Sequence, residues 1–177
     1  MAIIYKYLDT PLGSMMAAAT DEGICLFDFE YRRMLSTIQK RIQDALKMDY
    51  EEGEHPHFIA LEAQVKEYFN GNRKVFDLPL HLIGTAFQKK VWCGLLDIKY
   101  GETRSYKKQS MFLGDVKAIR AVGTANGQNG IAIIVPCHRV IGENGSLIGY
   151  GGGLPKKKWL LEHEAKHTYG DVQLPLF

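Results

Sequence analysis

Residues 131–140 read IAIIVPCHRV, an apolar run that ends in a cluster of reactive side chains. The five apolar residues predict a buried strand, and Pro136 and Cys137 follow at the point where that strand ends. A thiol beside an imidazole and a guanidinium is in surroundings that favour the thiolate, which is the nucleophilic form of cysteine. The stretch therefore predicts a nucleophilic cysteine at the end of a buried element.

Two short helices are expected before this stretch, over residues 106–113 and from 116 or 117 to about 126. Ser105 can cap the first helix, and Gly114-Asp115 is a tight turn between the two. The helical period predicts three inward positions, at Ala118, Ala121 and Val122. Helix, glycine turn, helix is the helix-turn-helix outline that many DNA-binding proteins share. Its outward face carries basic residues that can contact phosphates, namely Lys107, Lys108, Lys117 and Arg120.

After the cysteine, Asn144-Gly145 predicts a hairpin turn between short strands at 140–141 and 147–148. Residues 149–153, GYGGG, predict a flexible loop with few side chains. Pro155 suits the first turn of a last helix that is expected to reach about Ala165. The tail beyond that helix is expected to be mobile.

The first part of the chain predicts an α+β domain. Alternating apolar residues predict strands at residues 3–8, 15–19 and 23–29, and amphipathic patterns predict helices at 33–46 and 58–69. Residues 51–56 are expected to form a loop, and residues 75–83 could add a strand. A boundary near Ile83-Gly84 separates two expected domains, 1–83 and 84–177, of which the second is mostly helical.

A helix is expected to open the second domain. Thr85 and Gln88 have capping-box spacing, and the helix is expected to end at Tyr100-Gly101. Its apolar stripe comprises Phe87, Val91, Trp92, Leu95 and Leu96. Free cysteines are usually small hydrophobic residues of a core, and Cys25 and Cys93 are expected to be inert in this way.

Composition excludes several classes of protein. The 177 residues include 46% hydrophobic and 24% charged residues, which is ordinary for a globular protein. No apolar run reaches the length of a membrane span, and we expect no signal peptide. Three widely spaced cysteines are not a disulfide framework, and the histidines lack zinc-ligand spacing. We expect a reducing compartment and no bound metal.

Charge is divided unequally along the chain. Residues 1–84 carry 9 Lys and Arg against 13 Asp and Glu, whereas residues 85–177 carry 13 against 7. The net charges are therefore −4 and +6, which together give the +2 of the whole chain. A basic second half favours a polyanionic partner on that side.

Residues 85–165 resemble the catalytic domain of the O6-alkylguanine-DNA alkyltransferases, also called methylated-DNA–protein-cysteine methyltransferases. The resemblance rests on seven segments in the family's order: GTAFQ at 84–88, VW at 91–92, YGETRSY at 100–106, KAIRAVG at 117–123, IVPCHRVIG at 134–142, GY at 149–150 and WLL at 159–161. TPLG at 10–13 is similar to the family's smaller α+β domain. The likeness thus covers nearly the whole chain.

The resemblance implies a repair protein that rotates O6-alkylguanine, and also O4-alkylthymine, out of duplex DNA. Cys137 would accept the alkyl group irreversibly. His138 would act through a water as its base, Glu164 would orient His138, Asn129 would brace the site, and Tyr106 would help to discharge the guanine. DNA contacts are implied for Arg120, Lys117, Tyr106 and Ala121, with Arg120 filling the space that the base leaves in a minor-groove complex. Val140, Tyr150, Gly151 and Gly152 would line the alkylguanine pocket.

Single turnover follows from this chemistry, because a thioether is stable and nothing in the sequence would remove it. No cofactor motif is present, and we expect no cofactor. A monomer is expected, acting in the cytoplasm at the nucleoid of a prokaryote, or in the nucleus of a eukaryote. Lys107, Lys108 and Val116 depart from the family pattern; the two lysines add positive charge near the expected DNA surface, and none of the three changes touches the chemistry.

Three other functions are compatible with parts of the pattern. An alkyltransferase-like protein binds alkylated guanine but lacks the accepting cysteine, so Cys137 argues against it. A DNA-binding regulator with an incidental thiol would bind a specific sequence and leave the alkyl group in place. A thiol hydrolase would turn over many times on an ester or amide.

Overall fold

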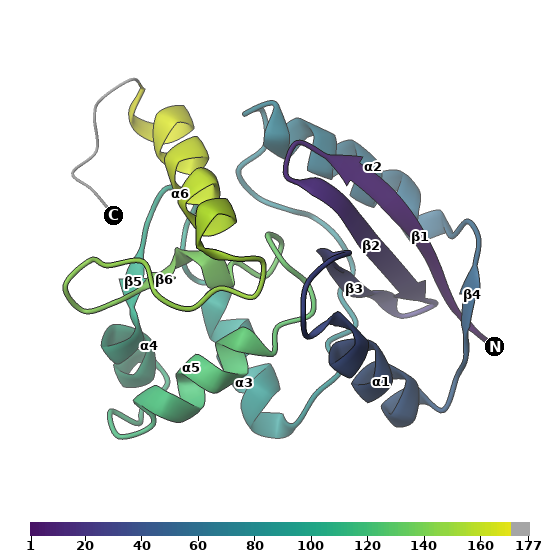
Figure 1. Cartoon of the computed structure of the whole chain (residues 1–177), viewed down its shortest axis with the longest axis horizontal. Helices are drawn as coiled ribbons and strands as arrows, with labels where there is room; N and C mark the ends of the chain where they lie inside the picture. The colour runs from purple at the N-terminus through teal and green to yellow at the C-terminus, as the bar shows by residue number, and fades with distance from the viewer. Residues whose placement is uncertain (171–177) are drawn as a thin grey trace. The chain divides into compact units, whose positions relative to one another are not determined.

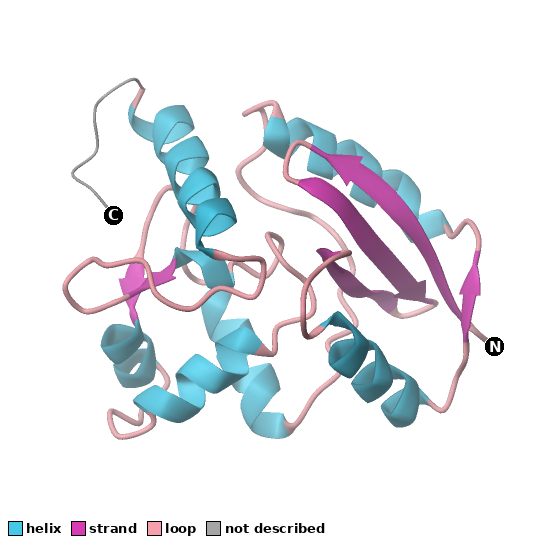
Figure 2. Cartoon of the chain, in the orientation of Figure 1, coloured by secondary structure: helices cyan, strands magenta, loops and turns pink. Residues whose placement is uncertain are grey.

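The computed structural model describes residues 1–170. The chain folds as two compact units, Met1–Thr85 and Ala86–Phe177 (Figure 1). Among the described residues, no helix combines the length and the apolar character that a membrane span needs. The small sheet lies in the first unit and most of the helices in the second, as the α+β prediction required (Figure 2).

The first unit is built on a four-stranded sheet in the order β3-β2-β1-β4. β1 (Ile3–Thr10), β2 (Gly13–Thr20) and β3 (Gly23–Phe29) form an antiparallel meander, and β4 (Tyr50–Glu52) pairs with β1 in parallel. Every residue of β3 is buried, and so are the last six of β2. The three strands predicted from alternation are confirmed.

Two helices accompany this sheet. α1 (Leu35–Leu46) buries one stripe of its surface, at Leu35, Ile38 and Ile42. α2 (Pro56–Phe69) begins at His55, whose ring nitrogen accepts a hydrogen bond from the His57 amide, and it ends at Asn70. Both predicted helices are confirmed to within three residues.

Two short segments of the first unit differ from the sequence prediction. Residues 50–52 form β4, although residues 51–56 were expected to be a loop. Residues 75–83 form no strand and make one isolated bridge between Leu80 and Ile24. Because Pro79 has no N–H to donate, the pairing of this segment with β3 does not extend further. It is limited to two hydrogen bonds, from Ile24 N to Pro79 O and from His81 N to Ile24 O.

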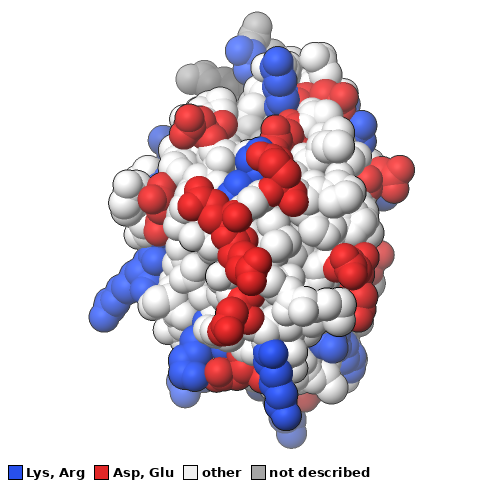
Figure 3. All heavy atoms as spheres, turned by 90° about the vertical axis from the view of Figure 1, so that its right-hand side faces the viewer, with Lys and Arg blue, Asp and Glu red and all other residues white. Residues whose placement is uncertain are grey.

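The first unit carries much of the acidic surface. Figure 3 shows a band of Asp and Glu side chains on one face, with few basic side chains among them. Exposed carboxylates on and beside β4 and α2 include Glu51, Glu52, Glu54 and Glu62. Lys6 is bound by two of them, with its ammonium 2.8 Å from Glu54 and 2.7 Å from Glu62.

The second unit consists of short helices around a minimal sheet. The helices are α3 (Ala86–Leu95), α4 (Tyr106–Phe112), α5 (Ile119–Gly127) and α6 (Leu154–Tyr169), with a single 3₁₀ turn, η1, at Cys137–Arg139. β5 (Arg104–Ser105) pairs in parallel with β6 (Val140–Ile141). α5 packs against both α3 and α4.

The expected helix pair is present at α4 and α5. The Ser105 hydroxyl accepts from the Lys108 amide, which confirms it as the cap of α4. α5 begins two or three residues later than expected, because Asp115 holds residues 115–118 in a turn through its carboxylate and its carbonyl. Val122 is buried, but Ala121 is exposed, so the inward position predicted for Ala121 is wrong.

Residues 131–135 are buried as predicted, but they do not form the predicted strand. Val135 N donates to Ile131 O at 3.0 Å, and Ile133 has a φ of 71°, so the chain turns back on itself. A positive φ is rare for a β-branched residue and needs support from the surroundings. Asn129 supplies it, because its side-chain amide donates to the carbonyls of Ile131 and Val135.

Other boundaries in the second unit also differ. α3 ends at Leu95 rather than near Tyr100. Asn144-Gly145 does form a turn, with Gly142 N bonded to Ser146 O, but residues 147–148 make no strand and β6 pairs with β5 instead of forming a hairpin. α6 continues to Tyr169, four residues beyond its expected end. The part of the expected mobile tail at 171–177 lies outside the described residues.

The two cysteines expected to be inert differ in their surroundings. Cys25 lies in β3, and burial raises its pKa to about 12, which keeps the thiol protonated. Cys93 is exposed on α3, so its expected place in the core is wrong. The predicted stripe of α3 was too wide: Val91, Trp92 and Leu95 are buried, whereas Phe87 and Leu96 are exposed.

Candidate functional site

Cys137 opens the η1 turn directly after the buried residues 131–135. Asn129 is the residue that connects this thiol to the turn before it. Its Nδ2 lies 3.3 Å from Cys137 Sγ and 2.9 Å from Val135 O, and its Oδ1 accepts from Ile131 N. One amide thus fixes the backbone on the approach to the cysteine and donates toward the sulfur.

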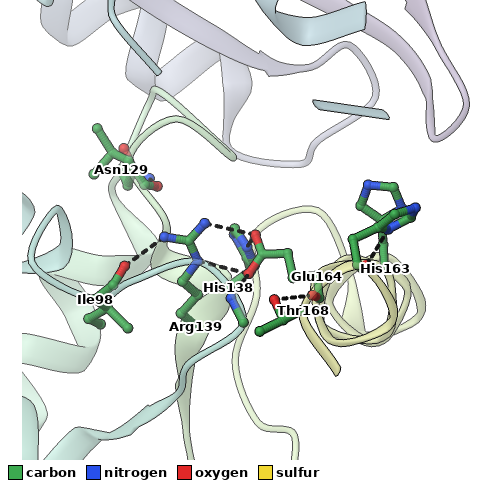
Figure 4. Close-up of polar contacts among 10 residues, drawn as sticks. Ile98, Asn129, His138, Arg139, His163, Glu164 and Thr168 are labelled. Atoms are coloured by element: carbon green, nitrogen blue, oxygen red, sulfur yellow. Dashed lines mark hydrogen bonds and ion pairs between the residues drawn. The ribbon is translucent and has the colours of Figure 1, made fainter. Parts of the chain in front are cut away.

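His138, Arg139 and Glu164 form a buried polar cluster beside the cysteine (Figure 4). His138 Nε2 lies 2.7 Å from Glu164 Oε1. Arg139 donates to both oxygens of the same carboxylate, each at 2.9 Å, and to Ile98 O at 2.6 Å. Glu164 comes from α6 and is completely buried, so η1 and α6 are joined through a single carboxylate.

The electrostatics of the cluster set the protonation of His138. Burial lowers the pKa of His138, and the attraction of Glu164 only partly offsets this. For Glu164, burial opposes ionisation, but His138 and Arg139 outweigh it and keep the pKa of the carboxyl below its ordinary value. A neutral imidazole facing an ionised carboxylate carries its proton on Nε2, so Nδ1 is left as an acceptor.

The Nδ1 atom of His138 is buried and has no hydrogen-bonding partner among the described residues. Cys137 and His138 are consecutive residues of the η1 turn, so the directions of their side chains decide whether they can touch. In the observed 3₁₀ turn, successive side chains are about 120° apart. They still diverge, which leaves room for a relayed contact between the thiol and Nδ1.

Tyr106 stands at the start of α4 and reaches the loop that precedes α6. Its hydroxyl donates to Ile148 O at 3.1 Å and to Gly149 O at 3.3 Å. Gly149 has a φ of 60°, and a Cβ there would lie only 3.2 Å from the Tyr106 hydroxyl, so a glycine is needed for this approach. Burial, with a smaller effect of Cys137, raises the pKa of Tyr106 to about 12, so the hydroxyl keeps its proton.

The residues predicted to line the pocket differ in their exposure to solvent. Val140 is buried in β6, Tyr150 and Gly152 are partly exposed, and Gly151 is exposed. Gly153 N donates to Tyr150 O, so residues 150–153 form a turn. The backbone of Gly151 is accessible there.

A separate surface is formed by α4 and α5. Lys107, Lys108, Lys117 and Arg120 are all exposed, in agreement with the outward basic face predicted from the sequence. Beside it lies an apolar pocket of about 580 Å³, whose walls include Tyr106, Ile119, Gly123, Ile148 and Gly149. Tyr106 therefore contacts the loop near the thiol and also borders a hollow next to α5.

Sequence reasoning missed two residues of the site. Arg139 was taken as a charge near the thiol, but its guanidinium is bound by Glu164 and Ile98. Lys157 was not singled out, although it is completely buried in α6. Helical spacing could have found it, since Lys157, Leu161 and Glu164 lie at i, i+4 and i+7 on one face.

Two family models match the chain. Residues 3–82 match the ribonuclease-like domain of 6-O-methylguanine DNA methyltransferase, and residues 86–166 match its DNA binding domain. The resemblance drawn from the sequence motifs is thereby confirmed.

Individual relatives and a solved structure support the same family assignment. A methylated-DNA–protein-cysteine methyltransferase of Mycobacterium tuberculosis is 54% identical over 172 residues, which cover 97% of this chain and 98% of that protein. A constitutive enzyme of the same name from Bacillus subtilis is 39% identical over 93% of this chain and 96% of its own. The crystal structure of Mycobacterium tuberculosis OGT in complex with DNA matches with a TM-score of 0.79 at 40% identity, covering 93% of this chain and 94% of that one.

Proposed function

This chain belongs to the 6-O-methylguanine DNA methyltransferase family, and we propose that it repairs DNA by moving the alkyl group of O6-alkylguanine onto its own Cys137. O4-alkylthymine is the second substrate of the proposal, and the protein acts as a monomer. The main support for this proposal is the arrangement at η1. Asn129 Nδ2 donates toward Cys137 Sγ, and the neighbouring His138 is bound by Glu164 at 2.7 Å.

The transfer begins with the thiol. His138 is neutral and its Nδ1 is an acceptor, so it can take the thiol proton through one water. The thiolate attacks the alkyl carbon in line, and a carbon–sulfur bond forms as the carbon–O6 bond breaks. The electron pair of the broken bond stays on the guanine. Glu164 stabilises the imidazolium that forms.

The departing guanine needs a proton. The Tyr106 hydroxyl is protonated at neutral pH and lies at the wall of the site, so on turning from the Ile148 carbonyl to the base it can supply that proton, and the proton that His138 took from the thiol restores the hydroxyl. Backbone N–H groups at Gly151 and Gly152 can donate to O6, and small residues there leave room for an alkyl group. The protein ends as a thioether and is consumed.

DNA is bound by the second unit. The exposed Lys117 and Arg120 flank the start of α5 and can contact the backbone of a duplex. The target base must leave the stack, which costs about a few kcal/mol. Arg120 fills the vacated space, and the exposed Ala121 next to it lets the helix approach the groove closely.

The experiment is intact-protein mass spectrometry after mixing with a duplex that contains one O6-methylguanine. A gain of one methylene, ~14 Da, on the Cys137 peptide, saturating at one per chain, is expected. Cys137→Ser should bind the same duplex without the gain, and an undamaged duplex should give none. Tight binding without transfer would indicate a damage-recognition protein instead, and continuous product formation would indicate a thiol hydrolase.

A further inference from the structure

The first unit has an open sheet edge that the proposed chemistry does not use. β4 pairs with only the first three residues of β1, and the rest of β1 continues past its end (Figure 1). Tyr5 O accepts a hydrogen bond from Gly53 N at this edge. Backbone groups two residues apart on a strand point in the same direction, so Tyr7 and Asp9 direct their N–H and C=O groups to the same edge beyond β4. Neither residue has a backbone partner there within the described part of the chain.

A groove of about 600 Å³ lies beside this edge, between β1 and α2. Its walls include the apolar side chains of Leu8, Val65 and Phe69 and the polar ones of Lys6 and Glu62. The five residues of β1 beyond β4 span about 17 Å, and an added strand would lie about 4.8 Å from them. The edge therefore offers the length and the backbone partners for one more strand of about five residues.

Negative charge and an exposed aromatic ring mark the other face of this edge. Tyr7 is 44% exposed, and burial raises its pKa, with smaller contributions from Glu30 and Glu52. These two carboxylates therefore lie close to the ring. Glu52 is opposite Tyr5 in the register, which places it on the same face as Tyr7 and Asp9. Asp9, Glu30 and Glu52 form no ion pair among the described residues.

The acidic character extends over this side of the unit. Figure 3 views the side on which β1, β4 and α2 lie in Figure 1, and it shows carboxylates gathered along it. Residues 1–84 carry 9 Lys and Arg against 13 Asp and Glu, so a polyanion such as DNA is repelled here and a polycation is attracted. Tyr7 adds a ring face that attracts a Lys or Arg side chain. The edge, the groove and the charge together fit an extended basic chain.

We propose that the open edge of β1 binds an extended, Lys- or Arg-rich segment of another protein as an additional strand. In this arrangement every second side chain of the segment is basic and faces Tyr7, Asp9 and Glu52. The side chains between them are apolar and enter the groove against Val65 and Phe69. Main-chain hydrogen bonds to Tyr7 and Asp9 hold the segment, and its alternate side chains select it. The site lies outside the alkyl-transfer machinery, so the proposal does not depend on the proposed function.

The test uses a fluorescent heptapeptide in which Lys and Val alternate, beginning and ending with Lys, as a probe of this chemistry. Its affinity for the full-length protein is measured by fluorescence anisotropy, and binding should saturate at one peptide per chain. Glu52→Gln is compared with Glu51→Gln, because both residues are exposed on β4 and their side chains point to opposite faces of the sheet. The dissociation constant of Glu52→Gln should exceed that of Glu51→Gln by at least threefold, and circular dichroism checks that both variants are folded.

Two methylated forms of the peptide test the backbone contacts. One carries N-methyl groups on the lysines and the other on the valines, and only one of these two sets of N–H groups can face β1 in an added strand. One form should therefore bind at least tenfold more weakly than the other. A smaller difference between the two forms, a smaller difference between the two variants, or no binding of the unmodified peptide would overturn the proposal. Dimerisation of the protein that the peptide reverses would also overturn it, because the edge would then take a second copy of this chain.

Discussion

Glu164→Gln is the substitution that tests the buried cluster most directly. Glu164 is completely buried and is shared by His138 at 2.7 Å and by Arg139 through two contacts of 2.9 Å. Glutamine has nearly the same shape, so the packing is retained. The substitution also removes the negative charge. It replaces one carboxylate oxygen, which accepts hydrogen bonds, by an NH2 group that must then face an N–H donor.

The magnitude follows from what the substitution leaves behind. Arg139 remains charged and buried, with Ile98 O as its remaining described acceptor apart from the new amide. Removing one partner of a buried ion pair costs about 3–5 kcal/mol, because the other charge is left uncompensated. The pKa of Glu164 lies below its ordinary value, so the carboxylate contributes its stability in full at neutral pH. That contribution is lost only as the pH falls below the ordinary carboxyl range.

Urea denaturation at pH 7, followed by tryptophan fluorescence, measures this loss. The only two tryptophans of the chain, Trp92 and Trp159, both lie in the second unit, so the signal reports the unit that contains the cluster. With a urea dependence of about 1.5 kcal/mol per M, the midpoint should fall by about 2–3 M. Glu162→Gln is the control, because Glu162 is exposed two residues away on α6.

The control should change the free energy of unfolding by less than about 0.5 kcal/mol, as expected for an exposed pair. The reasoning is refuted if Glu164→Gln costs less than about 1 kcal/mol more than Glu162→Gln. Such a result would mean that water or rearrangement compensates Arg139. The cluster would then not be the charge-balanced interior that its geometry indicates.

Further predictions concern other parts of the second unit. Arg120→Ala should slow the repair of duplex DNA more than tenfold and change the rate of reaction with free O6-benzylguanine by less than twofold, both measured by single-turnover kinetics. Equal losses of rate with the two substrates would refute the proposal that Arg120 fills the space left by the base. Because the pKa of His138 is lowered in the native state, the unfolded chain binds a proton at acidic pH that the native state does not bind. The free energy of unfolding should therefore decrease, as the pH is lowered from 6.5, by up to about 1.4 kcal/mol per pH unit. In urea titrations at several pH values, His138→Phe should show a smaller dependence on pH. Gly101→Ala should lower the free energy of unfolding by about 1–3 kcal/mol, because Gly101 has a φ of 80° and a Cβ there would lie 2.4 Å from Thr168 Oγ1. A urea midpoint equal to that of the wild type would contradict this, and would show that α6 can shift to accommodate the methyl group.

The sequence pattern correctly predicted those helices and strands that are determined by residues close to one another in the chain. Alternation gave the three antiparallel strands of the first unit, since β2 and β3 bury the residues that the pattern marks as apolar. Ser105 was correctly predicted as a cap, because a hydroxyl at that position needs only the amide three residues later. The family motifs located Cys137, Asn129 and Glu164, which the structure brings to one place.

The predicted strand at residues 131–135 failed because its apolar run has two explanations. Five consecutive apolar residues indicate burial, and burial is what the structure has, but periodicity cannot distinguish a strand from a buried turn. The turn depends on the Asn129 side chain, which replaces the pairing that a neighbouring strand would supply. A side-chain bond of this kind has no signature in the hydrophobic pattern.

The charges around the cysteine could not be assigned from proximity in the sequence. Arg139 is two residues from Cys137, yet its guanidinium is directed to Glu164, 25 residues further along the chain. Lys157, twenty residues from the cysteine, is near enough for an electrostatic effect between the two because α6 packs against the η1 turn. A basic residue next to a nucleophile in the sequence therefore indicates that positive charge is needed in that region, and the packing of a distant helix decides which residue supplies it.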